Sequence, residues 1–210
     1  MEVKILFKKN IVLFGLILSI VFLFIAGFYY PGGSLKNVNS IGYSFTENYI
    51  SNLLEYKAVN GMDNNARPFG IIGVVLLGLS SGLAFVRLSQ KIDLKKYSLV
   101  IKYLGILLII FSFLITIPSL HNLMVTLSSI ATLLLVFYVT IFLIKSKLKL
   151  LKLTSIILLV VFYGAAYMYF TKTGLDYLPT VQKIIHILQI IWILGLEYFT
   201  TKKDFDPIKS

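Results

Sequence analysis

Cysteine is absent from the 210 residues, which excludes disulfides, thiolate nucleophiles and cysteine-ligated zinc or iron–sulfur centres. Charged residues are also scarce, at 14% of the chain, whereas 58% of the residues are hydrophobic and the mean hydropathy is +0.87. A soluble domain of this length needs more polar surface than this composition supplies. The composition therefore favours an integral membrane protein, whose hydrophobic segments face lipid.

Acidic residues are few as well: 9 Asp and Glu stand against 20 Lys and Arg, which gives a net charge of +11. In a soluble protein this excess would suggest nucleic acid as the partner. Here the cations lie in short clusters between apolar runs, and no basic face is long enough to follow a phosphate backbone. We therefore expect no nucleic acid as a partner, and we expect the cations to set topology and to meet anionic membrane lipids.

Six apolar segments predict transmembrane helices, at residues 11–30, 69–86, 97–117, 122–144, 153–170 and 179–198. The first is longer than the apolar run of a signal peptide and precedes no A-x-A-like site, so we expect a retained helix. The sixth has an uncharged core only from 184 to 196, so Lys183 and Glu197 are expected to reach toward opposite interfaces. The predicted fold class is an all-α integral membrane protein, a six-transmembrane-helix bundle forming one domain over 1–210.

The basic clusters predict the orientation of the helices. With six spans, four clusters fall on one side: Lys4, Lys8 and Lys9; Arg87, Lys91, Lys95 and Lys96; Lys145, Lys147, Lys149 and Lys152; and Lys202, Lys203 and Lys209. The positive-inside rule then predicts cytoplasmic N- and C-termini, with residues 199–210 as a cytoplasmic tail, in the plasma membrane. The loop at 31–68 is predicted to be extracytoplasmic.

This loop contains a candidate amphipathic helix. Ser44 and Glu47 have the spacing of a capping box, which predicts a helix of about three turns starting there. Its apolar face would carry Phe45, Tyr49, Ile50, Leu53 and Leu54, and its polar face would carry Asn48, Ser51, Asn52 and Glu55. Asparagine offers both donors and acceptors, so this polar stripe suits water, a lipid headgroup or a buried polar network.

The histidines belong to the same predicted side of the membrane. His121 lies in the short turn between the third and fourth spans, and His186 lies inside the sixth, where Gln182, His186 and Gln189 share one helix face. The sequence contains neither a close-spaced pair of metal ligands nor a G-x-S-x-G motif, so no metal and no cofactor is expected. The candidate pocket for a ligand or headgroup consists of Asn48, Ser51, Asn52, Asn64, His121, Gln182 and His186.

Three functions fit these residues. The leading hypothesis is a lipid-interacting membrane protein with an outer-leaflet polar pocket. An enzyme acting on a lipid or lipid-linked headgroup would need Ser51, His121 and His186 to converge. A small-solute transporter would need a continuous polar path, and the span interiors hold no carboxylate for ion coupling. Gly78 and Gly82, in the small-residue segment GLSSG, predict either close packing inside the bundle or a homodimer.

Several short motifs between Tyr30 and Gly70 carry a resemblance to a known family. PGG follows the first span, and GYSF, NYIS, NG with NN, and ARPFG come after it. In these motifs and in its layout the chain resembles the domain of unknown function 998 family of bacterial and archaeal membrane proteins, which is distantly similar to the FGF-receptor-activating-protein and DRAM (damage-regulated autophagy modulator) families. The resemblance implies a six-span membrane protein and, through eukaryotic relatives linked to lipid-anchor remodelling and membrane trafficking, a role in lipid handling.

The chain departs from that family at one position. Relatives often carry Ser-Asp-Leu-Gly where this sequence has SNLL, residues 51–54. Asn52 therefore cannot act as a general base or as a charged metal ligand, and any chemistry that rests on that carboxylate is not expected here.

Overall fold

The structure is a computed structural model that describes residues 2–209, and side chains from Lys9 to Phe205. Met1 and Ser210, the ends of the predicted domain, lie outside the described residues. Six long helices follow one another: α1 Glu2–Tyr29, α2 Arg67–Ser89, α3 Lys95–Leu114, α4 His121–Lys145, α5 Lys149–Thr171 and α6 Leu178–Tyr198. No strand occurs among the described residues, and all six helices are long and apolar enough to cross a membrane. The all-α six-helix fold is confirmed, and the chain is a multi-pass membrane protein.

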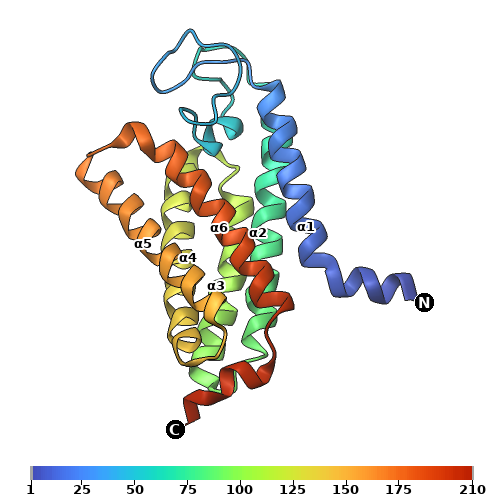
Figure 1. Cartoon of the computed structure of the whole chain (residues 1–210). Helices are drawn as coiled ribbons and strands as arrows, with labels where there is room; N and C mark the ends of the chain where they lie inside the picture. The colour runs from blue at the N-terminus through green and yellow to red at the C-terminus, as the bar shows by residue number, and fades with distance from the viewer. Residues whose placement is uncertain (1, 210) are drawn as a thin grey trace.

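The helices are connected as an up-and-down bundle (Figure 1). Consecutive helices pack against each other, and α6 returns to contact α2 and α1. An even number of helices places both chain ends opposite the connection between α1 and α2 (Figure 1). We call residues 31–66 the lid, because they cover one end of the bundle, and we call that end the lid end. The turns after α2 and α4 lie at the other end, together with their lysines.

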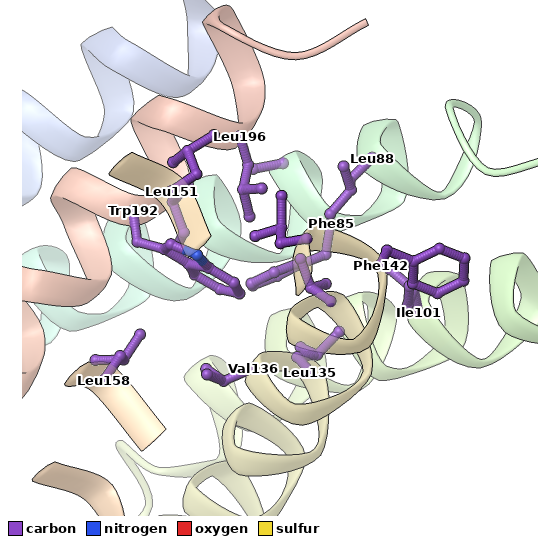
Figure 2. Packing of buried hydrophobic residues seen from close by; sticks show 14 of the residues in the cluster. Phe85, Leu88, Ile101, Leu135, Val136, Phe142, Leu151, Leu158, Trp192 and Leu196 are labelled. Atoms are coloured by element: carbon purple, nitrogen blue, oxygen red, sulfur yellow. The ribbon is translucent and has the colours of Figure 1, made fainter. Parts of the chain in front are cut away.

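The centre of the bundle is filled by apolar side chains (Figure 2). Trp192 of α6 and Phe85 of α2 point toward each other, with ring centroids 5.9 Å apart, and both are almost fully buried. The indole Nε1 of Trp192 donates to Ser155 Oγ of α5 at 2.6 Å, so the one polar atom of this large side chain has a partner. Leu135 of α4 and Leu158 of α5 complete the packing.

Small residues bring α2 and α3 close together. A Cβ added at Gly82 would lie 2.4 Å from the carbonyl oxygen of Gly105, and one at Gly78 would lie 2.1 Å from Ser112 Cβ. The GLSSG segment therefore packs inside the chain, which is the intramolecular alternative of the two that its sequence predicts. A homodimer stays a prediction, and one that uses Gly78 and Gly82 would have to displace α3.

The predicted helix in the lid is shorter than expected. A short helix does form between α1 and α2, but it is the five-residue 3₁₀ helix η1, Ile50–Leu54, in place of three α-helical turns from Ser44. The expected capping box is absent because its members bind elsewhere: Glu47 Oε2 accepts from Ser34 Oγ at 2.6 Å, and the Ser44 amide donates to Asn48 Oδ1 at 2.8 Å. These side-chain hydrogen bonds compete with helix formation. The predicted amphipathic pattern holds only in part. Leu53 and Leu54 are buried, but Phe45 of the expected apolar face is 54% exposed and Asn48 of the expected polar face is fully buried, because residues 44–49 form no helix.

The expected tail after α6 is also structured. Residues Lys202–Lys209 form a further 3₁₀ helix, η4, which contacts α4. Phe205 is buried against Phe142, with ring centroids 6.4 Å apart. The tail thus closes the end of the bundle opposite the lid.

Candidate functional site

Asparagines hold the lid together. Asn48 is fully buried: its Oδ1 accepts from the Ser44 amide, and its Nδ2 donates to the Gly33 carbonyl at 2.8 Å. Asn64 Nδ2 donates to the carbonyls of Asn52 and Glu55, while its Oδ1 accepts from the Ala66 amide. A loop without a sheet or long helix leaves many backbone groups unpaired, and a neutral amide supplies both kinds of partner. The abundance of asparagine in this segment follows from that need.

The PGG sequence at the start of the lid allows two chain segments to meet. Gly33 has φ +82°, a conformation that favours glycine, and a Cβ there would lie 2.3 Å from the Asn60 backbone nitrogen. Just before it, the hydroxyl of Tyr30 accepts from the Val59 amide at 3.0 Å. Burial raises the pKa of Tyr30, so this phenol stays neutral at physiological pH. The close approach of Gly33 to Asn60 joins two segments of chain inside the lid, and the Tyr30 hydrogen bond fixes the lid to the residue that follows α1.

Three side chains on the first two turns of α6 attach the lid to the bundle. Thr180 Oγ1 donates to the Thr46 carbonyl at 3.2 Å, and Gln182 Oε1 accepts from the Ile50 amide at 3.0 Å. Between them, the Lys183 ammonium donates to the Asn48 carbonyl and to the Pro179 carbonyl. We call Thr180, Gln182 and Lys183 the lid clamp. It joins segments more than 130 positions apart in the sequence.

Lys183 is an unusual member of this clamp, because its side chain is buried and only 5% exposed. The rings of Tyr43 and Phe45 lie over the ammonium, with their centroids 5.3 and 5.1 Å from Nζ. None of the three ion pairs in the described part of the chain includes Lys183. The side chain does extend toward the lid end, as expected, but it meets protein there in place of an open interface.

The histidines lie in different surroundings. His121 is buried at the start of α4, and its Nδ1 is 2.8 Å from the Ile115 carbonyl oxygen, so it closes the turn between α3 and α4. His186 is half-buried on α6, one turn further from the lid than Lys183, and its side chain makes no hydrogen bond within the described residues. Within that same range no hydrogen bond joins Ser51, His121 and His186, and no three potential metal ligands of the His, Asp or Glu type gather.

The seven predicted pocket residues thus fall into three groups. The network inside the lid contains Asn48, Asn52 and Asn64, whereas Gln182 links the lid to α6. The remaining three, Ser51, His121 and His186, share no hydrogen bond with this network in the described part of the chain. That these seven residues line a ligand site stays a prediction.

Sequence reasoning missed the part that Lys183 plays in this arrangement. The available signal was a lysine within a membrane helix near two glutamine positions, which predicts a polar face. Its burial depends on the lid folding over it, and that contact is not encoded near Lys183 in the sequence.

Comparison of the chain with protein-family models, with curated protein sequences and with solved structures finds no match. The resemblance to the domain of unknown function 998 family therefore remains an expectation from short motifs.

Proposed function

We propose that this multi-pass membrane protein binds an anionic lipid at the lid end of the bundle, with Lys183 as the cation that receives the acidic headgroup. The observation that carries the proposal is a buried ammonium without a carboxylate partner among the described residues. Burying an ammonium costs several kcal/mol unless hydrogen bonds or an opposite charge compensate for it. Two backbone carbonyls accept from Lys183, and the rings of Tyr43 and Phe45 lie over its ammonium. These neutral partners leave the positive charge without a neutralising partner among the described residues.

The neighbourhood of the clamp suits lipid. None of residues 159–171, the lid-end half of α5, is fully buried: one face packs partly against the core through residues such as Phe162, and the other face is exposed. Its exposed aromatic side chains are those expected at the depth of lipid headgroups: Tyr163, Tyr167, Tyr169 and Phe170. A lipid lying along α5 would bring its headgroup to the level of the first turns of α6, where the clamp begins.

The other two functions have less support. A transporter needs a polar path between both ends of the bundle, yet apolar side chains around Phe85 and Trp192 fill the half opposite the lid. An enzyme using Ser51 as nucleophile needs a histidine within hydrogen-bond reach, and the described residues contain no such hydrogen bond. Lipid binding needs neither feature.

The test measures lipid retention by native mass spectrometry. Protein in mild detergent is mixed with phosphatidylglycerol or with zwitterionic phosphatidylcholine, and the wild type is compared with Lys183→Met. The matched control is Lys172→Met, which removes an exposed lysine at the same end of the bundle. We expect phosphatidylglycerol to be retained by the wild type and by Lys172→Met but lost from Lys183→Met.

Two results would contradict the proposal: equal phosphatidylglycerol retention by Lys183→Met and the wild type, or no preference of the wild type for phosphatidylglycerol. The emission of the single tryptophan, Trp192, reports whether each variant is folded. If Lys183→Met does not fold, Lys183→Arg and Lys183→Gln replace it. Lys183→Arg should retain the lipid because it keeps the charge, and Lys183→Gln should lose it.

A further inference from the structure

A second charged feature lies at the end of the bundle opposite the lid. Three segments distant in sequence meet there and form an open groove of about 710 Å³: the start of the apolar part of α1, the end of α2 with the turn after it, and the end of α6. The lining residues are Lys9, Arg87, Gln90, Lys91, Glu197, Tyr198 and Lys202. Four of these are cations and one is a carboxylate. We call this feature the basic groove.

The inner wall of the basic groove is held in place by α6. Arg87 Nη1 donates to Glu197 Oε1 at 2.6 Å, and the Glu197 side chain is only 7% exposed. Lys91 Nζ donates to the carbonyls of Leu196 and Glu197, at 3.0 and 2.9 Å, at the C-terminal end of α6, and to Thr200 Oγ1 at 3.2 Å. Burial lowers the pKa of Lys91, and a bound anion would act in the opposite direction. The wall thus presents oriented cations that do not need to be ordered on binding.

The outer wall of the groove is exposed. Lys9 is exposed and makes no hydrogen bond or ion pair within the described residues, and Gln90 is also exposed. Lys202 pairs with Asp93 at 2.6 Å while remaining largely exposed to solvent. Two further carboxylates lie near the groove: Asp93, and Asp204, whose charge acts on Lys91. The four cations still exceed these two and Glu197, so the charge around the groove is positive on balance.

The position of the basic groove fits the headgroup layer of a membrane. Lys9 begins the apolar part of α1, and Tyr198 is the last residue of α6. Each of these two segments is long enough to span a bilayer. The volume lies within the range of small-molecule sites, about 300–1,000 Å³. Topology signals alone require only that lysines lie on one side of the membrane. They do not require residues of α1, α2 and α6 to converge around a preformed groove.

We propose that the basic groove binds a phosphate-bearing anion, namely the headgroup of an anionic lipid in the leaflet at this end of the bundle. Lys9 approaches the phosphate directly from the outer wall. Arg87 and Lys91 contribute positive charge from the inner wall, where their hydrogen bonds to α6 and Thr200 hold them in place. This site is separate from the one at the lid end, because the two lie at opposite ends of the apolar helices. It would hold a lipid even if Lys183 binds none.

The test compares two double variants that each change the formal charge by the same amount, in a Lys183→Met background that removes the proposed lid-end site. The groove variant is Lys9→Gln with Gln90→Glu, and the control is Lys147→Gln with Lys149→Gln, at exposed positions in the turn after α4 and at the first residue of α5. All four side chains are exposed, so folding should not depend on them. Binding of phosphatidylglycerol in detergent micelles is measured by native mass spectrometry titration.

We expect the groove variant to bind phosphatidylglycerol at least about tenfold more weakly, whereas the control changes affinity by less than about twofold, because charge near a headgroup acts locally. Inorganic phosphate is then added as a competitor. Competition would support recognition of the phosphate group itself, and lipid binding without competition would support recognition of the intact lipid. Equal weakening in both double variants, or weakening in neither, would overturn the proposal.

Discussion

Asn48→Ala is the most direct test of how the lid is held together. The substitution removes two hydrogen bonds and leaves the Ser44 amide and the Gly33 carbonyl without their partners, at a site where Asn48 is fully buried. A buried polar group without a partner costs about 1–3 kcal/mol. Water reaches a lid more easily than a helix core, so we take the lower part of that range for each group. The expected loss in lid stability is about 2–4 kcal/mol.

The loss should be local. Three lid residues, Leu53, Ala58 and Ala66, form a small apolar cluster with Ala26 and Tyr30 at the end of α1, and this cluster is separate from the main core around Trp192. Such a unit opens without unfolding the bundle. Hydrogen exchange followed by mass spectrometry therefore suits the question, because it reports lid and bundle amides separately. At 1.4 kcal/mol per factor of ten, lid amides should exchange roughly 30- to 700-fold faster, and amides of α3 and α4 should not change.

Two other asparagines of the lid provide the control. Asn39 and Asn65 are exposed, and their side chains make no hydrogen bond within the described residues. Asn39→Ala and Asn65→Ala should leave lid exchange within about twofold of the wild type, since exposed substitutions change stability little. Lid exchange in Asn48→Ala that matches these two variants would refute the reasoning, as would equal acceleration across all six helices.

Two further predictions concern the bundle. Gly82→Ala should destabilise the protein by about 1–3 kcal/mol, because the new Cβ would lie 2.4 Å from the Gly105 carbonyl oxygen. Gly164→Ala, where a new Cβ meets no heavy atom within 4 Å, should leave the melting temperature unchanged or raise it. Equal melting temperatures of the two variants would contradict the close α2–α3 contact. The absence of native cysteine allows single-cysteine labelling with a membrane-impermeant maleimide. Asn60→Cys should react from outside the cell and Lys149→Cys only from inside, and labelling of both from one face would refute an even number of spans.

The helices were predictable because their signal is local. A stretch of apolar residues as long as a bilayer is thick has few alternatives to a membrane helix, so segments such as 122–144 match the observed α4, His121–Lys145, closely. The third segment was expected to continue to 117, but α3 ends at Leu114, and the residues after it form a turn before Pro118. A proline disfavours helical conformation in the residue before it, which explains an early end.

The lid was not predictable in the same way because its contacts are distant in sequence. The Ser44 and Glu47 pattern is a sound local signal, yet Asn48 binds Gly33 and Glu47 binds Ser34, and these partners are available only once the PGG turn has formed. The same reasoning applies to Lys183, whose burial requires Asn48 and Tyr43 to lie over α6. Local sequence patterns predict the helices, whereas the contacts of Asn48 and Lys183 depend on which backbone groups remain unpaired once the lid has folded.

The buried charged side chains near the two ends of α6 differ in whether the protein supplies an opposite charge, and this difference links the lid to the proposed function. Near its last turn, Glu197 is buried but paired with Arg87, so the chain itself neutralises that charge. Near its first turn, Lys183 is buried beside amides, carbonyls and rings, which can accept its hydrogen bonds but cannot neutralise it. None of the ion pairs in the described part of the chain includes Lys183. In the function proposed above, its counter-ion therefore comes from the membrane, where lipid headgroups are the most abundant source of anions.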